Sequence, residues 1–270
     1  MKYSEIIRLN HELEGKLEGA EYKVAILSNI MVHQSKDICE YLLRIESINT
    51  KVVIGEYDNI VQDSEKNQDS DAVVIFWEAC NFIDGLQYKI DLFSDKEFNG
   101  IVNKIKLEID IVLSALKNTS IVIINKFSSL IFDQFSLSDN NLRRLIDILN
   151  KHLKDSVRVN TRLVDVDGII SRLSIKSATD LRYYHSSKTL YSVEFYKEYF
   201  ENIKYFFFAA NGKTKKALII DCDNTLWKGT LGEDGFDGIK IFQEVQYLAL
   251  QLSKNGVIIG LSSKNNSKDV

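Results

Sequence analysis

Two aspartates, Asp221 and Asp223, stand at the end of an apolar run in the stretch L-I-I-D-C-D-N-T-L-W, residues 218–227. One residue separates them, so in an extended segment both carboxylates lie on the same side, where like charges repel. Two close carboxylates push each other's pKa values apart, so that one can stay ionised while the other holds a proton. Such a pair suits a nucleophilic carboxylate beside a general acid/base, or two ligands of a divalent cation.

A second apolar run, residues 257–263, ends in Ser262 and Ser263 and is followed by Lys264. If the two runs form neighbouring strands, a hydroxyl and a cation lie beside the acids, which suits a bound phosphate group. Two acids alone are a weak signal, because surface strands often end in acids. The full pattern is D-x-D-x-T-L-W, then G-E-D-G, then S-S-K-N, and it is far more specific.

These motifs resemble the FkbH-like branch, subfamily IIIC, of the haloacid dehalogenase (HAD) superfamily. The resemblance rests on K-K-A-L-I-I-D-C-D-N-T-L-W-K-G-T-L-G-E-D-G-F-D-G-I at 215–239 and G-V-I-I-G-L-S-S-K-N-N at 256–266. The region ahead is also similar to that branch, in I-L-S-N-I, G-E-Y-D-N-I and the passage from D-L-R-Y-Y-H to Y-S. The similarity therefore extends from about residue 21 to the end of the sequence.

The resemblance implies a phosphoryl-transfer site that contains both aspartates. Asp221 would be the nucleophile that attacks phosphorus and forms an aspartyl-phosphate. Asp223 would protonate the leaving group and later activate water, while its backbone carbonyl binds Mg²⁺. Asp221 and Asp223 are thus the expected metal-site residues, with Mg²⁺ as the cofactor, and the cation would neutralise phosphoryl charge that otherwise repels the nucleophile.

The resemblance also implies roles for the residues around the aspartates. Thr225 would steady the loop. Ser263 would hydrogen-bond the transferring phosphoryl group, with Ser262 as the alternative. Residues 227–235 would form a hairpin flap beside the site, and Cys222 should point into the core.

The sequence departs from the HAD pattern beyond the second motif. HAD enzymes also use a lysine and one or two acids from later strands, whereas this sequence ends at Val270. Lys264 lies too close to the second motif to replace that lysine. The expectation is therefore an incomplete, inactive fragment that holds about the first half of a HAD domain, with no appreciable phosphatase turnover from residues 1–270 alone.

The remaining sequence predicts an α/β fold. Apolar β-rich runs alternate with segments of helical periodicity, which indicates a parallel sheet with helices on its faces and ligands at the carboxyl ends of the strands. The expected strands are 23–30, 51–57, 71–77, 120–127, 215–220 and 257–263, and the expected helices are 35–49, 95–116, 138–153, 192–210 and 239–256.

We expect two domains in this order along the chain. An N-terminal flavodoxin/SGNH-like three-layer α/β domain precedes the first half of a Rossmannoid HAD domain. The strongly aromatic helix between them is interpreted as packing between the two domains. The expected boundaries are an N-terminal helix at 1–20, the SGNH-hydrolase-like domain at 21–190, the aromatic connecting helix at 191–212 and the partial HAD domain at 213–270.

The leading domain resembles the SGNH hydrolase fold, which uses a serine, an oxyanion-hole asparagine and a late Asp-x-x-His pair. The matching positions are Ser28, Asn81, Asp180 and His185. Ser28 lacks the usual preceding Gly-Asp, and Asp180 and His185 stand two residues further apart than usual. A triad requires a base within hydrogen-bond reach of the hydroxyl. The alternative is a degenerate scaffold in which Ser28 caps a helix or hydrogen-bonds locally.

Composition limits the partners and the compartment. The 270 residues carry 34 Lys+Arg against 38 Asp+Glu. This charge balance gives no electrostatic reason to expect a nucleic-acid partner. No stretch approaches the roughly 20 apolar residues of a membrane span. Cys39, Cys80 and Cys222 have neither metal-site nor disulfide spacing, which indicates free thiols and a cytoplasmic location.

The expected activity follows from the resemblance. It is dephosphorylation of a phosphorylated small-molecule glyceryl donor and loading of the glyceryl unit on an acyl carrier protein, in polyketide or surface-glycan biosynthesis. Two other classes stay open. One is a non-catalytic module that binds a carrier or another partner, and the other is an SGNH-type esterase that uses Ser28 and His185.

Overall fold

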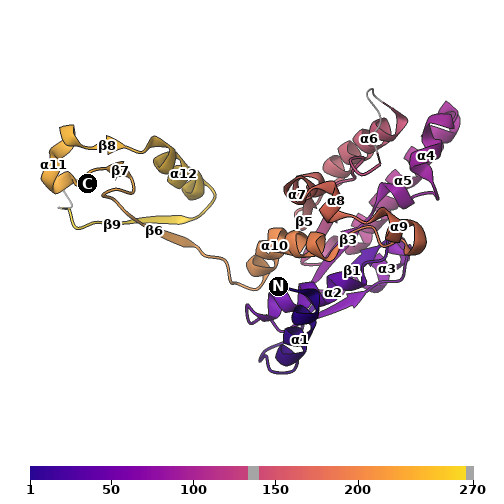
Figure 1. Ribbon diagram of the computed structural model, residues 1–270, viewed down its shortest axis with the longest axis horizontal. Coiled ribbons are helices and arrows are strands. Elements are labelled where there is room, and N and C mark those ends of the chain that lie inside the picture. Colours follow the sequence, from indigo (N-terminus) through magenta and orange to yellow (C-terminus); the bar gives the residue numbers. More distant parts are fainter. Residues whose placement is uncertain (133–139, 266–270) are drawn as a thin grey trace. The chain divides into compact units, whose positions relative to one another are not determined.

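The structure is a computed structural model that describes residues 1–132 and 140–265 (Figure 1). The chain forms two compact units, residues 1–211 and 212–270. Within the described ranges, no helix has both the length and the apolar character needed to cross a membrane. Cys39, Cys80 and Cys222 are all free and buried, as expected.

The first unit is built on a five-stranded parallel sheet, which confirms the α/β prediction. Its strand order is β2-β1-β3-β4-β5, an order typical of doubly wound folds. The strands are β1 (Tyr22–Ser28), β2 (Thr50–Ile54), β3 (Ala72–Phe76), β4 (Ile121–Asn125) and β5 (Thr161–Val164). Four of them overlap the expected ranges, whereas β5 was not predicted because it is a short edge strand that carries the exposed Arg162.

Alternate residues of each strand separate into two hydrophobic cores, one on each face of the sheet. In β3, Ala72, Val74 and Phe76 belong to one core, and Val73 and Ile75 belong to the other. This is the two-residue period of a strand that is buried on both faces. The sheet is therefore the middle of three layers.

Helices cover both faces of this sheet. The first face packs against α1 (Tyr3–Leu13), α2 (His33–Arg44), α7 (Val166–Leu173), α8 (Ile175–Ala178), α9 (Leu181–Ser187) and α10 (Val193–Ala210). The second packs against α3 (Ile60–Lys66), α4 (Leu86–Lys89), α5 (Asp95–Ala115) and α6 (Asn141–Ser156). Three 3₁₀ turns complete the unit: η1 (Ala79–Asn81), η2 (Ile90–Leu92) and η3 (Leu116–Asn118).

Local signals explain where several helices begin and end. Helix α2 ends earlier than the expected 35–49, because Ser47 takes a left-handed φ of 57° before β2 starts. Helix α5 opens with a capping box in which Ser94 and Glu97 satisfy each other's backbone N–H groups. Helix α6 is capped by Asn140, and residues 138 and 139 of the expected helix lie outside the described residues.

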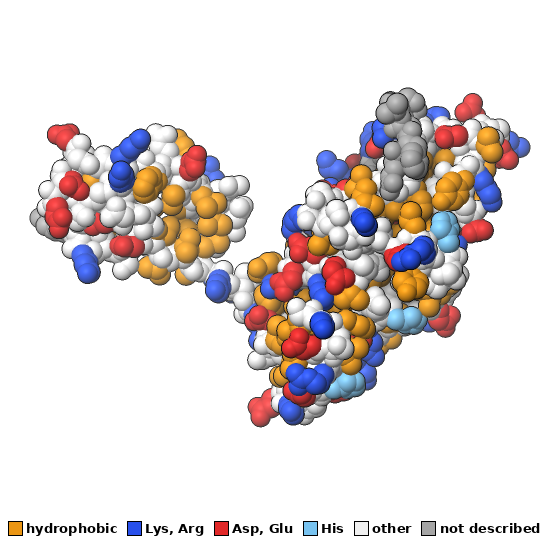
Figure 2. Space-filling model, in the orientation of Figure 1, with side chains coloured by type: hydrophobic (Ala, Val, Ile, Leu, Met, Phe, Trp, Pro, Cys, Tyr) orange, Lys and Arg blue, Asp and Glu red, His pale blue; other side chains and the backbone are white. Residues whose placement is uncertain are grey.

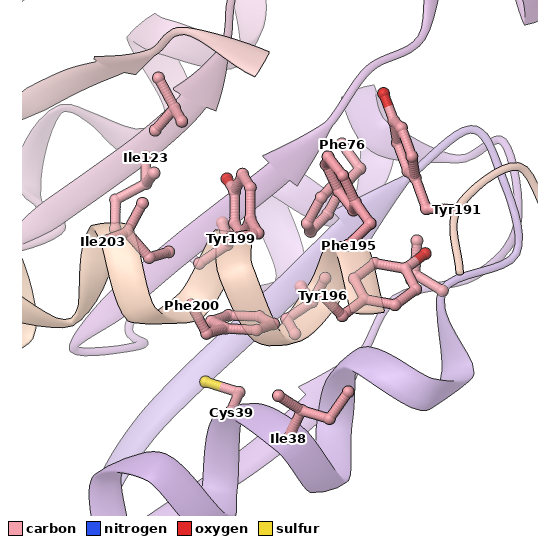
Figure 3. Close-up of a cluster of buried hydrophobic side chains, with 14 of the residues drawn as sticks. Ile38, Cys39, Phe76, Ile123, Tyr191, Phe195, Tyr196, Tyr199, Phe200 and Ile203 are labelled. Atoms are coloured by element: carbon pink, nitrogen blue, oxygen red, sulfur yellow. The ribbon is translucent and has the colours of Figure 1, made fainter. Parts of the chain in front are cut away.

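The aromatic helix α10, expected as a connecting helix, contributes to the core of the first unit. The rings of Phe195, Tyr196 and Tyr199 lie over the sheet (Figure 3). The ring of Phe76 contacts those of Tyr196 and Tyr199, with centroids 5.7 and 4.8 Å apart, and Phe195 stacks on Tyr191 at 3.8 Å. The excess of aromatic residues on this helix reflects burial against both the sheet and α2.

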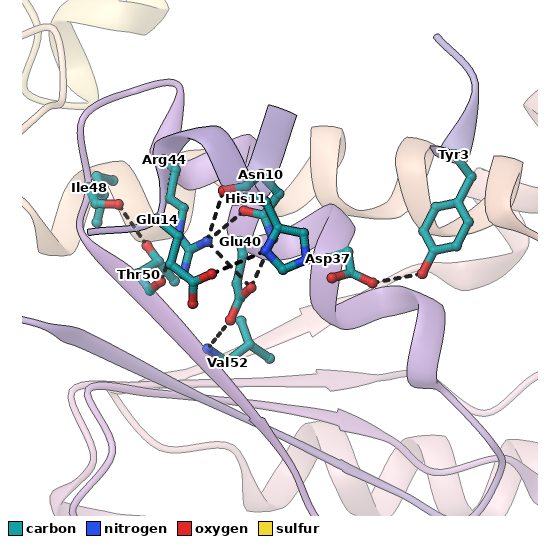
Figure 4. Close-up of polar contacts among 10 residues, drawn as sticks. All are labelled: Tyr3, Asn10, His11, Glu14, Asp37, Glu40, Arg44, Ile48, Thr50 and Val52. Carbon is teal, nitrogen blue, oxygen red and sulfur yellow. Dashed lines mark hydrogen bonds and ion pairs between the residues drawn. The ribbon is translucent and has the colours of Figure 1, made fainter. Parts of the chain in front are cut away.

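A buried polar network fixes α1 to the same unit (Figure 4). Glu40 on α2 accepts hydrogen bonds from the backbone N–H of Val52 (2.9 Å) and from Asn10 Nδ2 on α1 (3.0 Å). Arg44 donates to Asn10 Oδ1 (2.8 Å) and to the carbonyl of Thr50 (3.1 Å). The N-terminal helix, expected to be a separate segment, is thus tied to α2 and β2.

The second unit has a smaller core. Strand β6 (Ala217–Asp221) pairs in parallel with β9 (Ile258–Ser262), and β7 (Trp227–Lys228) pairs antiparallel with β8 (Lys240–Ile241). Helix α11 (Leu231–Gly238) lies between β7 and β8 in sequence, and α12 (Gln243–Lys254) follows β8. The expected helix at 239–256 begins later because residues 240 and 241 are used by β8.

Apolar surface is extensive on this unit. The buried core consists of Ile220, Cys222, Leu226, Trp227 and Leu231. Helix α12 has no buried residue, and Tyr247, Leu248 and Leu250 on it are more than half exposed. Figure 2 shows an area of exposed apolar side chains, in orange, on the second unit.

Candidate functional site

The carboxyl ends of β6 and β9 bring the motif residues of the second unit together. The parallel register places Asp221, the last residue of β6, opposite Ser262, the last residue of β9. Asp223 follows two residues after β6, and Ser263 and Asn265 follow β9 directly. Polar side chains from both motifs therefore meet at one edge of the sheet, where α/β folds place their ligands.

Asp223 is enclosed by three hydrogen-bond donors from the flap and from the β9 loop. Its Oδ1 accepts from the indole Nε1 of Trp227 (2.9 Å) and from the backbone N–H of Leu231 (3.1 Å). Its Oδ2 accepts from Asn265 Nδ2 (2.9 Å). The Leu231 N–H, followed by the Asn265 and Trp227 donors, holds the pKa of Asp223 below its usual value. The side chain is therefore a fixed carboxylate.

A tight turn after β6 sets the position of this carboxylate. The carbonyl of Cys222 accepts from the backbone N–H groups of Thr225 (3.2 Å) and Leu226 (2.8 Å). Asn224 has a left-handed φ of 56°, which asparagine tolerates, and its Oδ1 accepts from the backbone N–H of Gly229 at 3.0 Å. Thr225 lies within the turn, and Cys222 is buried.

Asp221 is oriented differently. The residue is exposed, and its Oδ1 accepts a hydrogen bond from the backbone N–H of Cys222 at 2.9 Å. Within residues 1–132 and 140–265, no other hydrogen bond involves this exposed carboxylate, so its second oxygen is available to a substrate or a cation. Of the two aspartates, Asp221 is the one whose side chain can act as a nucleophile or a metal ligand.

The residues at this sheet edge could bind a Mg²⁺ ion that is held by few protein ligands. Within the described residues, no group of three or more His, Cys, Asp or Glu side chains could enclose a metal ion. Mg²⁺, however, usually keeps several waters and binds through one or two carboxylates together with substrate phosphate. The Asp221 carboxylate meets this need, whereas the Asp223 carboxylate is occupied by protein donors. The backbone carbonyl of Asp223 is the ligand that the HAD resemblance implies.

Asn265 was not singled out from the sequence. It lies in the S-S-K-N segment, whose serines and lysine are the expected phosphate-binding groups. In the structure, the side-chain amide of Asn265 is the group that hydrogen-bonds to Asp223. Its backbone N–H donates to Ser263 Oγ at 3.0 Å, so Ser263 also shapes this loop. The sequence signal for this contact was the position of Asn265, three residues after the end of β9, in a loop that faces the acid after the neighbouring strand.

In the first unit, Ser28 is engaged locally, as in the alternative interpretation. Its Oγ donates to the carbonyl of Ile30 (2.6 Å) and accepts from the Ile30 N–H (2.9 Å), and the residue is 4% exposed. Among the described residues, no hydrogen bond links Ser28 to His185. The structure therefore does not assemble the expected nucleophile and base.

The other SGNH-like positions have structural partners. Asp180 caps α9 and binds Arg182 at 3.0 Å, which lowers the pKa of the carboxyl group. His185 is exposed on α9, with its ring beside that of Tyr184. Asp180 thus pairs with Arg182 and does not orient the histidine.

Asn81 takes part in the connection between β1 and β3. Its Nδ2 donates to the carbonyl of Asn29 and to the hydroxyl of Tyr57, so both amide hydrogens are used. The side chain of Asn29 in turn accepts from the backbone N–H of Glu78 (2.7 Å) and donates to its carbonyl (2.9 Å). This arrangement leaves Asn81 no donor for an oxyanion.

Comparison with solved structures shows the fold. No protein-family model matches the sequence, and no curated protein matches it. The whole chain superposes on 75% of the N-terminal part of protein BF1531 from Bacteroides fragilis, a structure containing a phosphatase domain complexed with Mg, with a TM-score of 0.75 and 20% identity. A further similarity covers 71% of this chain and 97% of the lipase Lip_vut3 from a goat rumen metagenome, with a TM-score of 0.50 and 11% identity.

Proposed function

We propose that the chain carries the nucleophile part of a HAD-type, FkbH-like phosphatase or phosphotransferase site, which acts through an aspartyl-phosphate on Asp221 with Mg²⁺. The proposed substrate is a phosphorylated glyceryl donor whose acyl unit passes to an acyl carrier protein. The observation that carries the proposal is the pairing of the tips of β6 and β9, which sets an accessible Asp221 beside a fixed Asp223 and two serines.

The two aspartates would have different tasks. An oxygen of Asp221 attacks phosphorus, the bond from phosphorus to the leaving oxygen breaks, and the phosphoryl group stays on the carboxylate. The leaving oxygen takes up a proton from solvent, because Asp223 is held as a carboxylate. Water then attacks phosphorus and releases phosphate from Asp221. Because three donors hold Asp223 as a carboxylate, its suited role is to accept the proton of that water. Bound Mg²⁺ would neutralise charge on the transferring phosphoryl group.

The shared fold supports the proposal. A structure that contains a phosphatase domain complexed with Mg aligns with the whole chain, and the Asp pair lies at the sheet edge where such folds bind ligands. The family, the substrate and the carrier protein come from the sequence resemblance.

The test is cation binding at Asp221. Mn²⁺, a paramagnetic substitute for Mg²⁺, is titrated into the ¹⁵N-labelled protein, and we expect it to broaden the amide signals of residues 221–225 before other signals. Mg²⁺ should compete, and Asp221→Asn should abolish the effect. Glu244→Gln, which removes an exposed acid of α12, is the matched control and should leave it intact. Equal broadening in Asp221→Asn and wild type would refute the proposal.

A further inference from the structure

Glu78 is a buried acid that the proposed mechanism does not use. It follows β3 by two residues, is 4% exposed, and its Oε1 has no hydrogen-bond partner among the described residues. A buried carboxylate without a partner is costly, because it has lost its water and gained nothing in exchange. Glu78 therefore favours its neutral form, and burial raises its pKa to about 7.

Two donors lie near this carboxyl group and are also unpaired in the described part of the chain. They are Asn125 Nδ2 at the end of β4 and the hydroxyl of Tyr191 in the segment before α10. Both are close enough to moderate the rise in the pKa of Glu78, yet neither meets hydrogen-bond geometry with it. Asn125 is held from its other side by the Tyr199 hydroxyl, which donates to Oδ1 at 2.7 Å.

The titratable groups that face Glu78 come from every element packed around it. They are Tyr191 before α10, Tyr196 and Tyr199 on α10, Cys80 on η1 and Asp167 on α7. Among the described groups that act on the Glu78 carboxyl, none is a cation, and Asp167 adds like charge. Ionised Glu78 thus has no charge partner in the packed state.

The aromatic cover above Glu78 joins α10 to the sheet. Tyr191 stacks on Phe195 of α10, with ring centroids 3.8 Å apart, and lies beside Phe76, which ends β3 two residues before Glu78 (Figure 3). The α10 rings close the same side of the sheet. Because Oε1 of Glu78 is shielded from solvent beneath this cover, fuller hydration of the carboxylate requires Tyr191 or α10 to shift.

We propose that Glu78 is a proton-operated lock for α10: while the carboxyl group is neutral, Tyr191 and α10 stay packed on the sheet, and its ionisation loosens this cover to admit water. The sign follows from proton binding. Because native Glu78 holds its proton up to about pH 7, folding is most favoured below the ordinary glutamate pKa of 4.5 and becomes less favoured as the pH rises from 4.5 to 7.

The first experiment compares the pH dependence of stability in wild type and Glu78→Gln. Urea unfolding of the whole chain is measured between pH 5 and pH 8. The unfolding equilibrium constant of wild type should rise about 70-fold more than that of Glu78→Gln over this range. An identical pH dependence in the two proteins would overturn the proposal.

The second experiment needs no variant and therefore does not depend on the folding of Glu78→Gln. A ¹³C titration of the native protein should give a side-chain carboxyl midpoint for Glu78 near pH 7. A midpoint near the ordinary 4.5 would remove the basis of the lock.

Hydrogen exchange locates the movement. After correction for intrinsic rates, amides of α10 should lose protection between pH 5 and pH 8, whereas those of α5, on the opposite face of the sheet, should not. Equal loss in both helices would show a global effect and refute the lock. Tyr191→Phe, which keeps the ring and Glu78, should retain the pH-dependent exchange of α10, and a loss of that dependence would count against the proposal.

Discussion

The substitution Arg44→Met tests how the network of Glu40, Asn10 and Arg44 holds the first unit together. The side chains of Arg44 and Glu40 are only 7% and 6% exposed, with 3.7 Å between Nη1 and Oε2. Arg44 also donates to Asn10 Oδ1 and to the carbonyl of Thr50. Methionine fills a similar volume but leaves these oxygens without their donor and leaves Glu40 as an uncompensated buried charge.

Removing one partner from a buried ion pair costs about 3–5 kcal/mol, which is a large share of a typical domain stability of roughly 5–15 kcal/mol. We therefore expect Arg44→Met to lower the free energy of unfolding by about 4 kcal/mol. Adding Glu40→Gln should recover part of the loss, because the amide is neutral and its oxygen can still accept from the Val52 N–H.

The assay is urea unfolding followed by ¹⁹F signals of fluorotryptophan, because Trp77 reports on the first unit and Trp227 on the second. Arg8→Met is the matched control, since the pair of Arg8 with Glu12 is exposed on α1 and should contribute less than about 0.5 kcal/mol. A loss below about 1 kcal/mol in Arg44→Met, equal to the control, would refute the reasoning.

Two further predictions follow from local geometry. Gly55→Ala should destabilise the first unit by about 1–3 kcal/mol, because the new Cβ would lie 2.6 Å from Asp63 Oδ2, which already accepts from the N–H of residue 56. Gly260→Ala meets only the end of the exposed Ile219 side chain and should cost less than about 1 kcal/mol, and both values are read from urea unfolding. Ser28 should resist labelling by a fluorophosphonate, as judged by intact-mass spectrometry, and stoichiometric labelling would contradict its local hydrogen-bonded role.

Most of the fold could be predicted from sequence because its signals are local. Runs such as Ala72–Phe76 are apolar at every position, as a strand buried on both faces requires, and the helices between them indicate parallel pairing. Strand β5 was missed because Thr161–Val164 is short and has only one partner strand, β4. The sheet partners of the α10 rings could not be predicted, because a ring-rich helix does not reveal which surface covers it.

The SGNH-like positions show what sequence spacing leaves undetermined. Ser28 and Asn81 do stand at the carboxyl ends of β1 and β3, but each is satisfied by nearby backbone or by Tyr57. A hydroxyl or an amide at a strand end is equally suited to catalysis and to closing a loop. Only the partners of each polar atom distinguish these uses, and they depend on contacts across the fold.

The repulsion within the D-x-D motif is resolved by giving the two carboxylates unequal surroundings. Cys222 between them is fully buried, so Asp221 and Asp223 both project from the same side of the chain. Three donors, two from the flap and one from Asn265, stabilise the charge of Asp223, whereas among the described residues Asp221 accepts only from its neighbour's N–H. An acid held ionised by fixed donors can sit beside a free one, and the free one is left for chemistry.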